Sequence, residues 1–554
     1  MRLVSLLLVG IVATLMFTSI WSAAVAADPS GQIDMKQARR QATGRRRRII
    51  YNDDGLYCAG QRGEPLKPYG TREELYKVRH RQIVNTQVDT IFYCSGETTI
   101  FAHESRVGDN YATVIPPNLE NPTARNVRMG ILGLRRAGYD TLGLNVEFCR
   151  QSRMEVFWSL RMNDIHGSLP YSSFGWELSR WKMDHPEYLM GTADDWHNYP
   201  QSSPRAWWSA LDYEIPQVRD YIFRVVEDVL QRYDVDGLEL DWMRSPMFFR
   251  PTLDMKPVES RHVAIMNKFV RRLRALTEQS AQQRGRPVPI ACRVPMSVER
   301  SRFVGLDVET WLTEDLVDIL ILGQGTGPLA MAPQIREMVK FAHQFEKPAY
   351  ACINNSNLRQ WDYSVEAYRG AAMNIWYAGA DGVYTFNYYP SQPSALLDQM
   401  GSPATLKGLD KVYGIDCVVA DEHEGDIRPG LVLPRRLPIR LTPGIWAQAH
   451  LVVGEDIVAH APEGRTCHAQ LRLRVSGFAQ GDEVSVRLDG EIVGAATPTR
   501  APSAEPAEVW LELNSDPKLI QEGDNLVELK LSGRGANDND EAVLDRLDLV
   551  VRYE

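Results

Sequence analysis

Two acidic residues separated by a single leucine, Glu239 and Asp241, lie near the end of the segment at residues 234–244. It runs Asp-Val-Asp-Gly-Leu-Glu-Leu-Asp-Trp-Met-Arg, and its alternation of apolar and acidic residues predicts a strand. Since successive strand side chains point to opposite sides, Glu239 and Asp241 share one face, while Leu238, Leu240 and Trp242 share the other. Two carboxyl groups on one face suit acid and base catalysis. A structural charge pair in the protein interior would produce the same pattern.

Further apolar runs that end in polar residues predict the fold that holds this strand. The predicted strands are residues 49–53, 88–94, 154–161, 235–242, 288–294, 317–322, 348–353 and 382–387. Helical periodicity lies between them, most clearly at residues 72–85, 217–233, 259–283, 334–345 and 364–378. Eight strands that alternate with helices predict a (β/α)8 TIM barrel of the α/β class. A doubly wound open sheet is the alternative, but no Gly-x-Gly-x-x-Gly motif follows the first strand.

The active site of a TIM barrel draws its side chains from the carboxyl ends of several strands. In this chain those ends are rich in polar residues, and we expect their side chains to converge on one cavity. The candidates are Asp53, Asp54, Glu97, Arg161, Asn163, Asp164, His166, Glu239, Asp241, Arg244, Arg293, Glu299, Gln324, Asn354, Asn387 and Tyr388.

Hydrolysis of a glycosidic bond is a reaction that such carboxyl groups can perform. It requires one carboxyl group that is protonated and assists the leaving oxygen, and a second that is ionised and attacks carbon or activates water. Asp241 lies one pleat nearer the mouth than Glu239 and suits the ionised role. We expect Glu299 to be the proton donor, with Asp164 and His166 as alternatives.

Glu239 is expected to remain ionised. If Arg161 and Arg293 on the flanking strands point inward, each directs a guanidinium at it, and a nearby arginine lowers the pKa of a carboxyl group. An ionised Glu239 would bind substrate hydroxyls or set the electrostatics of the site. A purely structural Arg-Glu-Arg network is the alternative.

The long connection at residues 163–211 is expected to lie over the mouth of the barrel. Loops of this length are usually functional or disordered, and tryptophans are rare in disordered segments. The loop contains Trp176, Trp181, Trp196, Trp207 and Trp208. Indole faces suit sugar rings, although these side chains could equally form a small core of the loop itself.

The residues expected to contact substrate come from this loop and from the strand ends. They are Arg161, Asn163, His166, Trp208, Arg244, Arg293, Gln324, Asn354, Asn387 and Tyr388. Two arginines in the pocket would also admit an acidic or sulfated glycan.

Composition and patterning predict the organisation of the 554 residues. An apolar run followed by Ala-Val-Ala predicts a signal peptide at residues 1–26, with an uncleaved membrane anchor as the alternative. A polar linker is expected at 27–48, the barrel at 49–415 and an all-β sandwich at 430–554, which could bind carbohydrate or brace the barrel.

Several classes of protein are not favoured. The seven cysteines do not suggest a disulfide framework, and Cys94, Cys149, Cys292 and Cys352 lie in apolar patterns typical of buried thiols. Neither a metal-binding spacing nor a cofactor motif is present, so we expect no metal and no cofactor. The net charge of -9 argues against nucleic acid as a partner.

Three segments together resemble a known family. They are residues 158–164 (Trp-Ser-Leu-Arg-Met-Asn-Asp), the tryptophan-rich loop with His185-Pro-Glu187, and residues 235–241 (Val-Asp-Gly-Leu-Glu-Leu-Asp). This set resembles the glycosyl-hydrolase-like family ten, exported bacterial TIM-barrel proteins of mostly unassigned activity, over most of residues 49–415. The resemblance implies a glycosidase-type barrel that acts on a polysaccharide or glycan.

The predicted fourth strand is also similar to that of other glycosidases. Asp241 matches the nucleophile position of amylase-type and α-galactosidase-type enzymes, but those carry Arg or Lys where this chain has Glu239. Chitinases of the Asp-x-x-Asp-x-Asp-x-Glu type place their acid where Met243 stands, so chitinase chemistry is not expected.

Taken together, these features predict an exported hydrolase of O-glycosidic bonds, secreted or periplasmic. The alternatives are a carbohydrate-binding or scaffold protein on a glycosidase-like barrel, and a different barrel hydrolase such as an esterase or deacetylase. Neither a nucleophile elbow nor a metal triad supports the last of these.

Overall fold

The computed structural model of the chain describes residues 34–55, 71–323, 332–355, 362, 364–388, 394–416, 437–478, 482–495, 497–500, 509–532 and 541–554. The expected signal peptide and Gln324 lie outside these residues. Within them, no helix combines the length and the apolar character that crossing a membrane requires.

Eight parallel strands close a barrel, as the alternation of strands and helices predicted. They are β1 (Ile49–Asp54), β2 (Val88–Cys94), β5 (Glu155–Arg161), β6 (Gly237–Asp241), β7 (Ile290–Val294), β8 (Ile319–Leu322), β9 (Ala349–Asn354) and β10 (Gly382–Phe386). Around the barrel the order is β1-β10-β9-β8-β7-β6-β5-β2. β6 and β10 therefore face each other across the interior, while Asp241 is in register with Arg161 on β5 and with Arg293 on β7.

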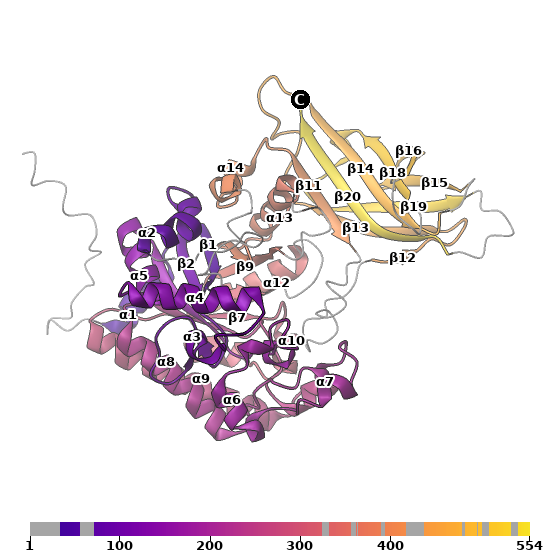
Figure 1. Cartoon of the computed structure of the whole chain (residues 1–554). Helices are drawn as coiled ribbons and strands as arrows, with labels where there is room; N and C mark the ends of the chain where they lie inside the picture. Colours follow the sequence, from indigo (N-terminus) through magenta and orange to yellow (C-terminus); the bar gives the residue numbers. More distant parts are fainter. Residues whose placement is uncertain are drawn as a thin grey trace, which may run out of the picture.

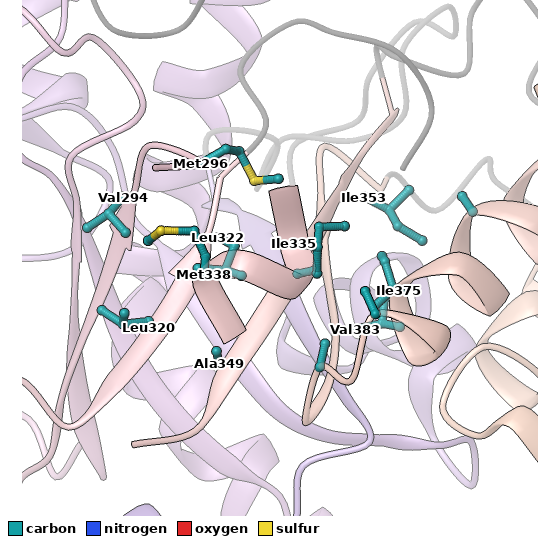
Figure 2. Packing of buried hydrophobic residues seen from close by; sticks show 14 of the residues in the cluster. Val294, Met296, Leu320, Leu322, Ile335, Met338, Ala349, Ile353, Ile375 and Val383 are labelled. Carbon is teal, nitrogen blue, oxygen red and sulfur yellow. The ribbon is translucent and has the colours of Figure 1, made fainter. Parts of the chain in front are cut away.

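The two faces of each strand pack into two separate cores. The barrel interior is filled mainly by aromatic and small apolar side chains, among them Phe92, Phe157, Tyr384 and Phe386. The outward faces pack against the helices, and Figure 2 shows Leu320 and Leu322 of β8 beside Met338 of one such helix. Leu238, Leu240 and Trp242 belong to this outer core, so the predicted alternation of β6 is confirmed.

The five predicted helices are present. They are α2 (Arg72–Leu75) with the π and 3-10 turns that follow it to Ile83, α8 (Pro216–Arg232), α9 (Ser260–Arg284), α12 (Ala332–His343) and α13 (Val365–Tyr377). The structure adds α3 (Tyr111–Val114), α4 (Pro122–Arg136) and α5 (Thr141–Ser152) between β2 and β5, α10 (Val298–Phe303) and α11 (Val308–Thr313) between β7 and β8, and α14 (Pro403–Leu406). The tryptophan-rich loop holds only short helices, including α6 (Arg180–Asp184) and α7 (Asp195–Asn198). A two-stranded sheet pairs β3 (Ile100–Phe101) with β4 (Asp109–Asn110).

The segment before β1 differs from the solvated polar linker that we expected at residues 27–48. Its described part forms α1 (Met35–Thr43), which Asp34 caps at the N-terminus. Arg47, in the run of four arginines, is fully buried, and its Nε donates a 2.8 Å hydrogen bond to Glu155 at the start of β5. A polar linker would be solvated, whereas this arginine neutralises a buried glutamate.

The C-terminal region forms two antiparallel sheets, which confirms the predicted β-sandwich. One sheet has the order β11-β20-β14-β18-β17, with β12 paired to β20, and the other has the order β13-β19-β15-β16. The strands are β11 (Lys411–Asp416), β12 (Ile439–Arg440), β13 (Trp446–Val453), β14 (Cys467–Ser476), β15 (Glu483–Leu488), β16 (Glu491–Ala495), β17 (Thr497–Arg500), β18 (Val509–Ser515), β19 (Gly523–Ser532) and β20 (Val543–Tyr553). We expected the barrel to extend to residue 415, but β11 pairs with β20 of the C-terminal region.

Helix α13 joins the barrel to these sheets (Figure 1). Asn374 donates a 3.1 Å hydrogen bond to the carbonyl oxygen of Val452 in β13. A Cβ at Gly370 would lie 2.0 Å from the carbonyl oxygen of Val412, so only glycine permits this close approach. The sandwich therefore packs on the side of the barrel formed by β9 and β10.

Candidate active site

A first group of charged side chains lies at the carboxyl end of β6, and we call it the Asp241 cluster. It comprises Glu239, Asp241, Arg293 and Tyr384. Oδ2 of Asp241 lies 3.1 Å from Nη1 of Arg293, and its Oδ1 accepts the backbone N–H of Met243 at 2.9 Å. From across the barrel, the hydroxyl of Tyr384 donates to Oε2 of Glu239 at 3.2 Å. Both carboxyl groups thus point into the barrel, as predicted.

The protonation of Glu239 differs from our expectation. Burial, together with the nearby charge of Asp241, raises the pKa of Glu239 to about 8. Arg293 lowers it, but this arginine makes its ion pair with Asp241. Arg161 does not contact Glu239, because it turns toward β1 and β2. Glu239 is therefore a protonated acid at neutral pH and not the ionised residue that two flanking arginines would have produced.

A second group lies beside the end of β5, and we call it the Arg161 cluster. It consists of Asp54, Glu97, Arg161, Asp164, His166, Glu177, Lys182 and Arg244. Arg161 contacts Glu97, lies 3.1 Å from Asp54 and lies 3.7 Å from Asp164. Nδ1 of His166 is 2.8 Å from Asp164, which closes the group on the side of the loop.

The loop after β5 completes this cluster with charged groups of its own. Oε2 of Glu177 lies 3.6 Å from Nδ1 of His166, and Arg244, which follows β6, has its Nη2 2.6 Å from Nε2 of the same imidazole. Lys182 is buried and donates to the carbonyl oxygens of Asp164 and Ser209. The loop is therefore attached to the strand end by polar contacts as well as by its aromatic side chains.

Burial and neighbouring charges divide the protons unequally in the Arg161 cluster. Burial and the Glu97 carboxylate raise the pKa of Glu177 well above its usual range. For Asp164, burial is outweighed by His166, Glu97 and Arg161, so its pKa is held well below the usual range. Burial lowers the pKa of Lys182 to about 8. One carboxyl group is thus kept protonated close to another that is kept ionised.

This cluster also has the ligand atoms of a possible metal site. Glu97, Asp164, His166 and Glu177 each offer one such atom, and these atoms lie within 4.8 Å of one another. Arginines already contact Glu97 and Asp164, and they would repel a metal cation. The geometry favours a network of ion pairs over a metal site. No spacing motif marks the set, because its members come from two strand ends and one loop.

Other predicted residues are placed differently. Glu299 is exposed in the first turn of α10 and belongs to neither cluster. Asn163 is fully buried, and its amide pairs with Leu211 and Met247, so it holds two loops together and is not available to a sugar. Tyr388 is buried between Tyr51 and Tyr368. Asn354 is buried at the end of β9, and Asn387 is partly exposed after β10.

All five loop tryptophans pack into the protein. Trp176 is buried beside Tyr111, and Trp181 stacks on Tyr221 of α8 with ring centroids 3.8 Å apart. Trp196 meets Trp207 edge to face at 5.3 Å. Trp208 is half-buried and packs against the outer core. The alternative that these side chains serve as core residues therefore applies to all of them.

The two inward arginines are both engaged with carboxyl groups. Arg161 pairs with Glu97 and Asp54, and Arg293 pairs with Asp241. The guanidinium of Arg293 also lies 3.8 Å above the ring of Phe386. An acidic or sulfated glycan would have to displace these partners, so the structure removes the reason for expecting one.

Sequence reasoning did not select three residues of the two clusters. Glu177 and Lys182 lie in the long loop, where no strand end marks them, and Tyr384 lies in the middle of β10. The one signal that the sequence offered for Glu177 was its position directly after Trp176. The four cysteines predicted to be buried thiols, Cys94, Cys149, Cys292 and Cys352, are free and buried.

Comparisons with solved structures give matches of low identity and low TM-score. The PgaB (BpsB) glycoside hydrolase domain of Bordetella bronchiseptica is 11% identical with a TM-score of 0.40, and the match covers 65% of this chain and 99% of that one. The alpha-L-fucosidase isoenzyme 2 of Paenibacillus thiaminolyticus is 10% identical with a TM-score of 0.40, covering 64% of this chain and 48% of that one. This chain thus spans about half the length of the fucosidase.

A family GH18 chitinase of Chromobacterium violaceum is 11% identical with a TM-score of 0.35, and the match covers 92% of this chain and 89% of that one. No curated protein matches the sequence. The resemblance that the strand motifs predicted is confirmed by a family model, because residues 127–249 match the family described as glycosyl hydrolase-like 10.

Proposed function

We propose that this protein is an exported glycoside hydrolase that cleaves O-glycosidic bonds in a polysaccharide or glycan. The observation that carries the proposal is the pairing of Asp241 with Arg293 at the carboxyl end of β6, beside a second cluster that keeps one carboxyl group protonated. This is the division of labour that glycoside hydrolysis requires. Secretion or release to the periplasm depends on residues 1–26, and an uncleaved anchor is the alternative.

Asp241 is the proposed nucleophile or base. Held by its ion pair with Arg293, its carboxyl group would attack the anomeric carbon or take a proton from water. As the glycosidic C–O bond breaks, its electron pair goes to the leaving oxygen, and that oxygen must receive a proton. The reaction therefore also requires a proton donor beside Asp241.

Glu177 is the proposed acid, in place of Glu299 and Asp164. The exposed Glu299 lies outside both clusters, and Asp164 is held ionised and cannot donate. Glu177 is kept protonated by burial and by Glu97, and it reaches the strand end next to that of Asp241. Glu239 also carries a proton, but it lies deeper in the barrel, where it would tune Asp241.

The proposed substrate contacts are the predicted residues whose polar groups lie around the mouth. They are His166, Trp208, Arg244 and Asn387, with Gln324 outside the described residues. Asn163, Arg161, Asn354 and Tyr388 are reassigned to structural support, because their side chains are buried.

The direct test is release of reducing ends from a panel of polysaccharides by the parent and by Asp241→Asn. We expect turnover by the parent and a loss of at least about a thousandfold in the variant, because the attacking group is removed. Retention of full activity in Asp241→Asn would contradict the proposed role.

A comparison of leaving groups tests the assignment of the acid. An aryl glycoside with a good leaving group needs little protonation, so loss of the acid should affect it far less than a natural sugar linkage. We expect Glu177→Gln to show this selective loss, and Glu239→Gln to reduce both activities alike. The opposite pattern would make Glu239 the acid.

A second candidate function is a carbohydrate-binding or scaffold protein without catalysis. One observation favours it: Asp241 is only 2% exposed and Glu239 is 0% exposed, so both carboxyl groups are covered in this structure. Glycan binding that survives in both parent and Asp241→Asn, with no bond cleavage by either, would establish this function.

A further inference from the structure

A hollow of about 450 Å³ lies on the outer wall of the barrel, apart from both charged clusters. It is lined by Trp181, His185 and Tyr188 of the tryptophan-rich loop, and by Gln217, Asp220 and Arg224 of α8. Figure 1 shows α6, α8 and α9 on the side of the barrel far from the C-terminal sheets. Helices of a TIM barrel begin at the end where the active site lies, and Gln217 is in the first turn of α8. The hollow is thus near the mouth but outside it.

One wall of the hollow is a fixed aromatic stack. The ring of Trp181 packs on the buried Tyr221, with centroids 3.8 Å apart and an interplanar angle of 18°. His185 and Tyr188 stack on each other at 4.7 Å, and each lies 5.5 Å from Trp181. The rings are held by their mutual contacts, so a ligand would meet a wall that is already formed.

The other wall offers hydrogen-bonding groups. Asp220 forms an ion pair with Arg272 of α9, and the guanidinium of Arg272 lies 3.9 Å above the ring of Phe223. In the described part of the chain, the structure gives the amide of Gln217 no side-chain partner, and it gives Arg224 only the ring of Tyr221 at 5.9 Å. The hollow therefore combines a carboxylate, an amide and guanidinium groups with exposed aromatic surface.

We propose that this hollow is a second binding site for a pyranose ring of a glycan chain. The proposal uses the substrate class of the proposed function but none of its catalytic residues. Aromatic surface accepts the C–H faces of a sugar, while mixed donors and acceptors match hydroxyl groups, which both donate and accept. The volume lies within the usual range of small-ligand pockets, about 300–1,000 Å³. The hollow holds a carboxylate beside its guanidinium groups, which favours a neutral sugar over a bare anion.

A site at this position would hold a polymer whose other part enters the barrel. Because the hollow and the mouth lie at the same end of the fold, one chain could occupy both, and the second contact would raise the local concentration of substrate. The alternative is that the stack only anchors the loop on α8. The two differ in whether exposed polar residues of the hollow affect binding.

The test is affinity electrophoresis of the full chain through gels that contain dextran, xylan, chitosan or alginate. It uses Asp241→Asn as the background, so that the matrix is not degraded. We expect Tyr188→Ala and Arg224→Ala to weaken retardation in at least one gel about tenfold, from the loss of a stacking ring or a charged donor. Tyr199→Ala, which removes an exposed tyrosine outside the hollow, and Arg136→Ala on α4 are matched controls that should bind like the background protein.

The outcomes separate this inference from the proposed function. Retardation that falls in the hollow variants supports it even if the parent cleaves nothing. Equal retardation of hollow and control variants, or none in any gel, overturns it even if Asp241→Asn abolishes hydrolysis. Since Arg224 is exposed on the outer face of α8, its variant should fold normally, and an unchanged unfolding temperature would confirm that.

Discussion

The two clusters of buried charge lie at the ends of adjacent strands, but their charges are balanced differently. In the Asp241 cluster, one guanidinium, from Arg293, serves two carboxyl groups on the same strand. In the Arg161 cluster, four carboxyl groups face two arginines and one imidazole, while the ammonium group of Lys182 donates to the carbonyl oxygens of Asp164 and Ser209. Where positive charge is too scarce to serve every buried carboxylate, one of them keeps its proton. The carboxyl group that keeps its proton is Glu239 in the Asp241 cluster and Glu177 in the Arg161 cluster.

An arginine that lies near two carboxyl groups does not by its position alone determine which of them it pairs with. Arg293 lies within the influence of both Glu239 and Asp241, yet its ion pair is with Asp241. Burial is therefore the dominant effect on Glu239, and its pKa is raised instead of lowered.

Replacing Glu239 with Gln should remove a strong dependence of stability on pH. A group whose pKa is about 8 in the folded protein and 4.5 ordinarily contributes stability that is complete below pH 4.5 and is lost as the pH rises through 8. Relative to Glu239→Gln, the parent should therefore lose on the order of 5 kcal/mol in its free energy of unfolding between pH 4 and pH 9. Urea unfolding of both proteins across this range measures the difference. A difference that does not change with pH would mean that Glu239 is ionised when folded.

Replacing Arg293 with Met should destabilise the protein by about 3–5 kcal/mol, because it leaves the buried Asp241 carboxylate without its cation. The double variant Arg293→Met, Asp241→Asn should recover a large part of this loss, since no unpaired charge remains. Arg271→Met is the control, because Arg271 pairs with Glu314 on the surface and should cost at most about 1 kcal/mol. If the double variant were less stable than Arg293→Met, the pair would not be the source of the cost.

The barrel could be predicted from sequence because its signals are local. Each strand is an apolar run that ends in polar residues, and all eight predicted runs coincide with barrel strands. The helices α4 and α5 were not singled out, and β11 was included in the barrel. The partner of β11, strand β20, lies more than a hundred residues along the chain, so no local pattern could reveal the pairing.

The candidate site could be predicted only as far as strand geometry reaches. Alternation placed Glu239 and Asp241 on the inner face, which their contacts with Tyr384 and Arg293 confirm. It could not say that Arg161 turns away toward Glu97, because a side chain with several rotatable bonds chooses among partners that only the fold brings together. Glu177 was missed for the same reason, since a loop residue has no strand register from which to infer its direction.

Asp164→Asn and Glu177→Gln should separate the two protonation states within the Arg161 cluster. Asp164 is held ionised by its neighbours, so its neutral replacement should cost about 2–4 kcal/mol. Glu177 already carries a proton, and an amide can donate as its hydroxyl does, so Glu177→Gln should cost at most about 1 kcal/mol. Thermal unfolding at pH 7 measures both. Equal losses would show that the cluster does not divide its protons as described.

Glu299→Gln should change stability and activity less than the other substitutions. This result would show that the site does not include the first turn of α10. Glu299 is exposed in the first turn of α10, where its charge interacts with the helix N-terminus, so its loss should cost only about 0.3–1 kcal/mol. Because Glu299 belongs to neither cluster, turnover of any glycan that the parent cleaves should remain within about twofold, and its pH profile should not move. Hydrolysis rates from pH 5 to pH 9 provide the measurement. Loss of the alkaline limb of the profile in this variant alone would return the role of proton donor to the loop after β7 and remove it from the Arg161 cluster.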